Sequence, residues 1–196
     1  MKADDPRWVE VTPSQFTHEA EGLRLVREFL PSAPPYRAWS NFEFRDSQGR
    51  WHEVDLLVLG RGRLHLVELK YYRGLLGGDD HRWVRDRRRA EDSPLLLAHR
   101  KAQRLASLLR ETFWEWAREN PHVAVPQARK VVPFVQESVF LHHPDLRCVL
   151  PAASRKDLFG LEGHERTSGL PGLATRLLET PTGEAIGENR STIIRR

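Results

Sequence analysis

Two apolar segments, Trp51-His52-Glu53-Val54-Asp55-Leu56-Leu57-Val58-Leu59 and Leu64-His65-Leu66-Val67-Glu68-Leu69-Lys70, decide the fold that this sequence predicts. Each has the length and the aliphatic content of a strand, and only Gly60-Arg61-Gly62-Arg63 separates them. A connection this short joins antiparallel neighbours. The nearly continuous apolar run in the first segment predicts burial on both faces of the sheet. We therefore expect a central hairpin with layers packed on both sides.

Five further segments have the periodicity or the composition of regular structure. They predict a helix over residues 14–30, strands over 36–45, 130–142 and 147–150, and a second helix over 94–119. Thr12-Pro13-Ser14-Gln15 has the pattern of a capping box for the first helix. Residues 71–93 are polar and rich in Gly, Asp and Arg, which predicts a long loop. The order α-β-β-β-α-β predicts an α/β fold (α+β), in which a mixed sheet carries a helix on each face.

Length and composition are those of an ordinary globular protein. The chain has 196 residues and a formal net charge of +4, and its single Cys148 excludes a disulfide framework and a Cys-based zinc site. The sequence has no long apolar run and no N-terminal signal pattern, so we expect a cytoplasmic protein without a membrane partner. We expect one domain over residues 1–155, and over 156–196 an extension that starts a linker or a further domain of a longer protein.

Three charged residues interrupt the two apolar strands. Asp55 lies inside the first strand, whereas Glu68 and Lys70 lie two positions apart at the end of the second, where they share a face. Hairpin geometry brings Asp55 beside Glu68, and neighbouring carboxylates repel unless they share a cation such as Mg²⁺. A lysine beside them suits the orientation of a water molecule or the stabilisation of a phosphate. An ordinary ion pair at a strand end is the alternative interpretation.

The same residues carry a resemblance to a nuclease family. Segments 53–58 and 64–70, followed by Gly74, resemble the NERD (nuclease-related) domain of the PD-(D/E)xK nuclease superfamily. Segments within 14–44 and 93–101 are similar to the NERD segment of the kinases of phage-growth-limitation (BREX-type) defence systems. The resemblance thus covers roughly residues 12–150.

The resemblance implies a restriction-endonuclease-like core and a metal-dependent site. Asp55 and Glu68 correspond to ligands of Mg²⁺ or Mn²⁺, and Lys70 corresponds to the catalytic lysine. The superfamily often adds a carboxylate from the first helix, where Glu19 lies in the apolar stripe and faces the sheet; a structural ion pair is the alternative for Glu19. Glu53 shares a strand face with Asp55 and is either an outer ligand or a solvated charge.

Two positions depart from the family pattern. Val54 stands before Asp55 where the superfamily often has proline, and Leu97 stands where many NERD sequences carry glutamine early in the second helix. Lys101 follows one turn later on the same helix face and is a candidate supporting residue for the site. The alternative is a lysine that only extends along the helix edge.

Basic residues gather between positions 81 and 110. This segment holds nine Lys and Arg residues against three acidic residues, which suits contact with a phosphate backbone. The predicted DNA-binding residues are Arg82, Trp83, Arg85, Arg87, Arg88 and Arg89. In this set the indole of Trp83 would stack on a base. A solvated arginine-rich loop is the alternative.

The sequence therefore predicts a metal-dependent nuclease domain of a phage-defence protein that hydrolyses or nicks DNA. Its expected cofactor is Mg²⁺ or Mn²⁺, and its expected partners are DNA and other proteins of the defence system. The alternative is a catalytically silent module of a defence kinase, which would bind DNA or a partner and leave the chemistry to the kinase.

Overall fold

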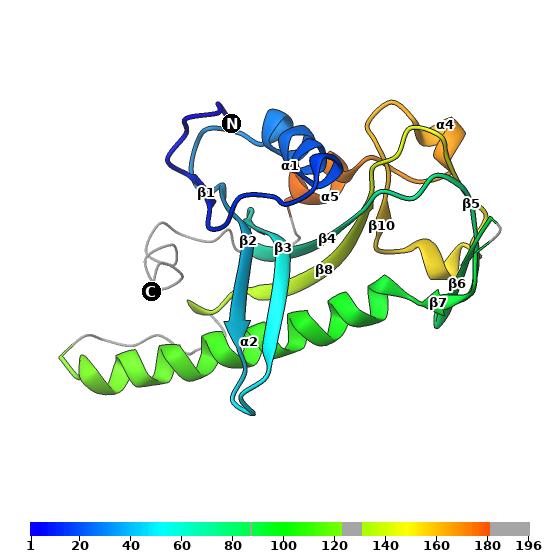
Figure 1. Ribbon diagram of the computed structural model, residues 1–196. Helices are drawn as coiled ribbons and strands as arrows, with labels where there is room; N and C mark the ends of the chain where they lie inside the picture. The colour runs from blue at the N-terminus through cyan, green and yellow to red at the C-terminus, as the bar shows by residue number, and fades with distance from the viewer. Residues whose placement is uncertain (87, 123–130, 181–196) are drawn as a thin grey trace.

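The computed structural model describes residues 1–86, 88–122 and 131–180. Within these residues the strands form a six-stranded sheet of order β1-β2-β3-β4-β8-β10 and a four-stranded sheet of order β7-β6-β5-β9 (Figure 1). In chain order the elements are β1 (Trp8–Glu10), α1 (Thr17–Phe29), β2 (Arg37–Arg45), β3 (Trp51–Leu59), β4 (Arg63–Lys70), β5 (Gly74–Gly78), β6 (Arg82–Arg85), β7 (Glu91–Asp92), α2 (Pro94–Glu119), β8 (Phe134–Leu141), β9 (Leu146–Cys148), the 3-10 helix η1 (Ala153–Arg155), β10 (Leu158–Phe159), α4 (Glu165–Ser168) and α5 (Leu173–Leu177).

The large sheet is mixed, as its sequence pattern predicts. Strands β2, β3 and β4 form an antiparallel meander in which Leu57 is the register partner of both Trp39 and Leu66. Strand β8 then pairs with β4 in parallel, and Glu68 lies opposite Val139. The predicted mixed α/β fold with the order α-β-β-β-α-β is therefore confirmed.

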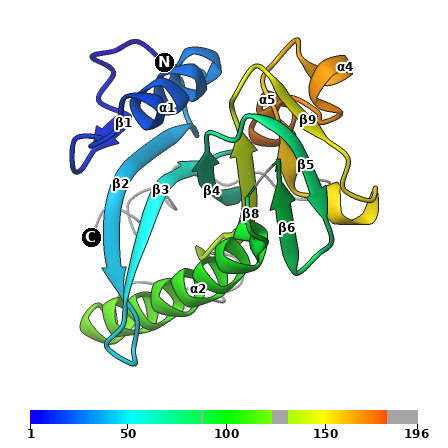
Figure 2. The ribbon, with the colours of Figure 1, turned by 45° about the vertical axis from the view of Figure 1, so that its right-hand side comes forward.

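The continuous apolar run of β3 is explained by helices on both faces of the large sheet. On one face Leu56 and Val58 pack with α1 and α5, and on the other Leu57 and Leu59 pack with α2. Figures 1 and 2 show α2 crossing one face while α1 and α5 lie together at the other. Alternate residues of a strand point to opposite faces, so a strand between two layers is apolar throughout.

The small sheet replaces most of the long loop expected over residues 71–93. The pattern of this segment is Gly- and Arg-rich, but Leu76 and Trp83 are buried at its centre with Leu146 of β9. Strand β9 pairs with β5 in parallel, so the strand expected at 147–150 begins one residue earlier, ends at Cys148 and belongs to a second sheet. The prediction of a loop was wrong because a non-local partner, rather than local periodicity, stabilises these short strands.

The predicted capping box at the start of α1 was also wrong. The helix begins at Thr17 after the N-cap residue Phe16, which makes no side-chain capping hydrogen bond. The hydroxyl of Ser14 instead accepts a hydrogen bond from Asn41 Nδ2 at 2.8 Å. The segment before α1 is thus held by the sheet rather than by the helix end, and β1, which the sequence did not predict, pairs there with β2.

Part of the expected C-terminal extension belongs to the packed unit. Strand β10 pairs with β8 in parallel, and Phe159, Leu173 and Leu177 are buried against the α1 face of the large sheet. The boundary expected at residue 155 therefore falls inside this unit, whereas residues 181–196 lie outside the described residues. Across the part of the chain that the structure describes, none of the helices is both long and apolar enough to cross a membrane.

A test of the α1 packing is the substitution Gly22→Ala. A Cβ atom at Gly22 would lie 2.7 Å from Leu69 Cδ2 and 3.0 Å from His142 Cε1, and both neighbours are buried. Overpacking costs about 1–3 kcal/mol, which exceeds the helix propensity of about 1 kcal/mol that alanine adds. We expect urea unfolding to give a free energy of unfolding lower by about 1 kcal/mol. The matched control Glu21→Ala, at the adjacent exposed position, should stay within about 0.5 kcal/mol; a stabilised Gly22→Ala would contradict the close packing.

Candidate active site

The site lies where β3 and β4 separate. Their ladder runs from Leu59 opposite Leu64 to Leu56 opposite Val67, and no register pair follows it. Beyond this point Asp55 Oδ2 accepts a hydrogen bond of 2.7 Å from the backbone N–H of Leu69. A carboxylate thus continues the link between the strands where the backbone ladder ends. This places Asp55 next to Glu68, as the spacing in the sequence predicts.

Two lysines from different elements approach the Glu68 carboxylate. Glu68 is buried, with 4% of its surface exposed. Lys101 Nζ, from α2, donates a hydrogen bond of 2.5 Å to Oε1, and Lys70 Nζ, from β4, lies 3.7 Å from Oε2. The side chain of Lys101 therefore reaches the site across the sheet face, as one of its two sequence interpretations proposed.

The carboxylates of the site act on one another electrostatically. Burial, and then the charge of Asp55, raise the pKa of Glu68, while Lys101 and Lys70 oppose the rise. Burial and the charge of Asp55 likewise raise the pKa of Glu19, and the charges of His18 and Lys70 oppose it. The charge of Asp55 thus acts on both Glu19 and Glu68, so carboxylates from α1, β3 and β4 interact electrostatically.

A cavity of about 590 Å³ opens beside Asp55. Glu19 of α1 and Glu53 of β3 line it together with Asp55, and Phe16 and Trp51 contribute exposed rings to the same walls. The structure therefore brings the predicted Glu19 and Glu53 to Asp55 on this side. Lys70 and Lys101 gather at Glu68.

The predicted DNA-binding segment lies away from this cavity, on the small sheet. Trp83 is buried, with 1% of its surface exposed, so its ring is not available to stack on a base, because it forms the core under β5 and β6. Arg85 pairs with Glu91 at 3.0 Å, and its guanidinium lies 3.9 Å from the centroid of the Tyr72 ring. The side chains of Arg82, Arg88 and Arg89 are exposed, and Arg87 lies outside the described residues.

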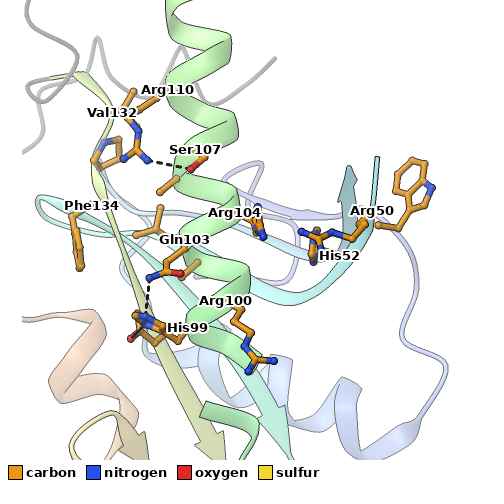
Figure 3. Close-up of a pocket in the computed structure, with 16 residues that line it drawn as sticks. Arg50, His52, His99, Arg100, Gln103, Arg104, Ser107, Arg110, Val132 and Phe134 are labelled. Atoms are coloured by element: carbon orange, nitrogen blue, oxygen red, sulfur yellow. Dashed lines mark hydrogen bonds and ion pairs between the residues drawn. The ribbon is translucent and has the colours of Figure 1, made fainter. Parts of the chain in front are cut away.

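A second groove, of about 1030 Å³, follows both flanks of α2 (Figure 3). On one flank Arg104 extends toward Arg50 and His52 of the β2–β3 hairpin, and Arg100 lies one turn before it. Arg104 Nε is 3.9 Å from Asp46 Oδ2, and Arg50 Nε is 3.2 Å from the same oxygen. Sequence reasoning missed Arg50 because nothing in the local pattern indicates that the hairpin turn reaches α2.

No ready-made metal cage is visible in the described parts of the chain. Among residues 1–86, 88–122 and 131–180, no group of three or more His, Cys, Asp or Glu side chains is arranged to hold a metal ion. Asp55 and Glu68 are neighbours, but Lys101 holds one oxygen of Glu68. As described, the site is an ion-paired carboxylate pair, with Glu19 next to Asp55.

The central antiparallel meander, the parallel β8 strand and the Asp55/Glu68/Lys70 set define a nuclease-like α/β domain. The nuclease-related domain family (NERD) matches residues 17–141, and the chain belongs to this family. Over 160 residues the chain is 39% identical to "Probable kinase PglW" of Streptomyces coelicolor. The aligned segment covers 80% of this chain and 9% of that protein. No solved structure matches the chain.

The raised pKa of Glu19 predicts a pH-dependent effect of Glu19→Gln. A carboxyl group whose pKa is higher in the folded than in the unfolded state lowers stability once the pH exceeds both values. Glutamine removes this penalty, so Glu19→Gln should raise the free energy of unfolding at pH 7 by a few tenths of a kcal/mol. The gain should fade as the pH drops through the folded pKa and vanish below the unfolded value of about 4.5.

Urea unfolding at pH 7 and at pH 4 measures this difference. Glu21→Gln is the matched control, because Glu21 lies on the exposed side of the same helix. The same gain in both variants, or a gain of equal size at both pH values, would contradict the electrostatic link between Glu19 and Asp55.

Proposed function

We propose that this chain is a metal-dependent nuclease domain of a phage-defence protein, and that it hydrolyses or nicks DNA phosphodiester bonds. The observation that carries the proposal is the meeting of Asp55, Glu68 and Lys70 where β3 and β4 separate. Membership of the NERD family supports the same chemistry.

The donor set fits a hard divalent cation. Carboxylate oxygens are the ligands that Mg²⁺ and Mn²⁺ prefer. Asp55 raises the pKa of Glu68, so the two groups repel one another when both are ionised, and a shared cation would relieve that repulsion. Asp55 and Glu68 would hold Mg²⁺ or Mn²⁺, with Glu19 as a third carboxylate. Such an ion supplies Lewis acidity and a water molecule of lowered pKa.

The remaining residues bind and orient. Lys70 keeps 30% of its side-chain surface exposed, so its ammonium group can donate a hydrogen bond to an attacking water or to a phosphate oxygen. Lys101 fixes the rotamer of Glu68 through Oε1 and is therefore a positioning residue. Glu53, exposed on the wall of the cavity, serves as an outer carboxylate that orients water.

The defence context comes from the relative with the kinase name. The aligned segment spans only 9% of that relative, so a kinase, other defence proteins and a cytoplasmic location are parts of the proposal. In this arrangement the chain is the nuclease-related module of a larger BREX-type protein. Exposed arginines of β6 and of the connection to β7, namely Arg82, Arg88 and Arg89, offer further contacts to the phosphates of DNA.

One observation favours a second candidate, a catalytically silent module that binds DNA or a partner protein. Both oxygens of Glu68 face lysine ammonium groups, and the described residues contain no three-ligand metal group. Such a carboxylate can serve as a purely structural ion pair between α2 and the sheet. The two candidates differ in whether Asp55 and Glu68 bind a metal.

Cleavage of supercoiled plasmid in Mg²⁺ tests the first candidate. We expect the wild-type chain to nick the plasmid, and Asp55→Ala and Lys70→Ala each to lower the rate by about 100-fold or more, because each removes a group that acts on the reacting phosphate. Lys156→Ala is the control, since this exposed lysine lies far along the chain near β10 and should leave the rate unchanged. Equal rates in all variants, or no cleavage by the wild type, would contradict the hydrolase.

Calorimetric titration with Mn²⁺ separates the two candidates without any cleavage. A nuclease site predicts one bound ion in the wild type and loss of the binding heat in Asp55→Ala. Lys101→Met should retain or strengthen metal binding, because it frees Glu68 Oε1 from its ion pair. A wild-type chain that binds no ion, while all three proteins unfold at similar urea concentrations, would favour the silent module.

A further inference from the structure

Exposed aromatic rings surround the candidate active site. Trp51 and Phe16 keep 65% and 60% of their surface exposed, and both line the cavity that contains Asp55. Tyr71 directly follows Lys70 and is 39% exposed. Exposed large apolar rings cost free energy in water, so two of them in the walls of one cavity indicate a binding surface.

Two of these rings belong to a column of rings that starts in the core. Buried Phe140 lies 5.4 Å from the His142 ring, and His142 lies 5.2 Å from Tyr71. Tyr71 then stacks on His18 at 5.4 Å with an interplanar angle of 24°, and His18 stacks on Phe16 at 5.6 Å and 23°. The column therefore fixes Phe16 from within the protein and places its outer end in the wall of the carboxylate cavity.

The cationic groove along α2 adjoins the carboxylate cavity at Trp51, which lines both. The same groove contains Arg50, Arg100 and Arg104 (Figure 3). The carboxylates of the cavity repel phosphates, whereas the neighbouring groove is net positive: Arg50 and Arg104 share the single carboxylate of Asp46, and Arg100 is exposed. The charges therefore favour phosphates beside α2, and the cavity offers the exposed rings of Phe16 and Trp51.

We propose that the carboxylate cavity and the groove along α2 together bind single-stranded DNA, with unpaired bases stacked on Trp51 and on Phe16 at the outer end of the ring column. The phosphates of the strand lie along Arg50, Arg100 and Arg104. Bases in a duplex are already stacked and paired, so they have no free face for Phe16 or Trp51, whereas every unpaired base has one. This substrate class rests on the proposed DNA hydrolase.

Binding of a fluorescein-labelled 20-nucleotide strand and of its duplex, in EDTA, tests the inference. By fluorescence anisotropy we expect the 196-residue chain to bind the single strand at least about tenfold more tightly than the duplex. Phe16→Ala and Trp51→Ala should each weaken single-strand binding on the order of tenfold and leave duplex binding unchanged. Phe16→Tyr should retain the affinity because it keeps a stacking ring.

Trp114→Ala is the matched control, since Trp114 is an exposed ring, with 51% of its surface accessible, at the other end of α2 and outside both grooves. A 2-aminopurine base in the strand gives a second readout, because stacking on a ring quenches its fluorescence. Equal binding of strand and duplex, or ring variants that bind and quench like the wild type, would overturn the inference.

These outcomes are separate from those of the plasmid assay. Ring-dependent single-strand binding without metal-dependent cleavage would leave the chain as a single-strand-binding module and remove the hydrolase. If cleavage depends on Asp55 but binding is unchanged by Phe16→Ala and Trp51→Ala, the hydrolase stands and the single-strand inference falls.

Discussion

The structure depends on burial of β3 and β4 from both faces, because this burial confines the carboxylates of the two strands to the point where their ladder ends. The apolar run from Leu56 to Leu59 packs alternately against α1 and against α2, so a charge in its middle would be expensive. Asp55 and Glu68 lie just where the ladder between the strands ends. There the Asp55 carboxylate links the two strands by accepting a hydrogen bond from the backbone N–H of Leu69. The candidate site therefore lies at the end of the paired region of the sheet.

Sequence reasoning succeeded where the signal is local. The period and length of the apolar segments gave β3 over Trp51–Leu59 and α2 over Pro94–Glu119, and the hairpin spacing placed Asp55 beside Glu68. It failed where the partner is distant in the chain. The small sheet needs β9, Trp83 is buried under that sheet, and β10 enters the large sheet from beyond the expected boundary. Composition marks residues 71–93 as a polar loop because most of the described residues in this segment are exposed.

The candidate site combines three interacting carboxylates with two lysines. Asp55 sits between Glu19 and Glu68 and raises the pKa of both, whereas Lys101 and Lys70 act chiefly on Glu68. Glu68 therefore has two lysine partners, whereas on the cavity side the charges of His18 and Lys70 offset only part of the pKa rise of Glu19. The partly compensated carboxylates on the cavity side favour a cation from solvent, and the arginines on α2 favour an anion beside them.

The choice of lysine at this site is informative in so arginine-rich a chain. The sequence has 26 Arg and 5 Lys, and two of the five lysines meet at Glu68. A guanidinium presents a rigid fork that engages both oxygens of a carboxylate, whereas an ammonium is a compact charge that engages one. Lys101 occupies Oε1 alone, and Lys70, at 3.7 Å from Oε2, stays free to turn toward another acceptor. A bidentate arginine at either position would lock Glu68 as a structural residue; lysine keeps one oxygen exchangeable, as a carboxylate that binds a metal or a water requires.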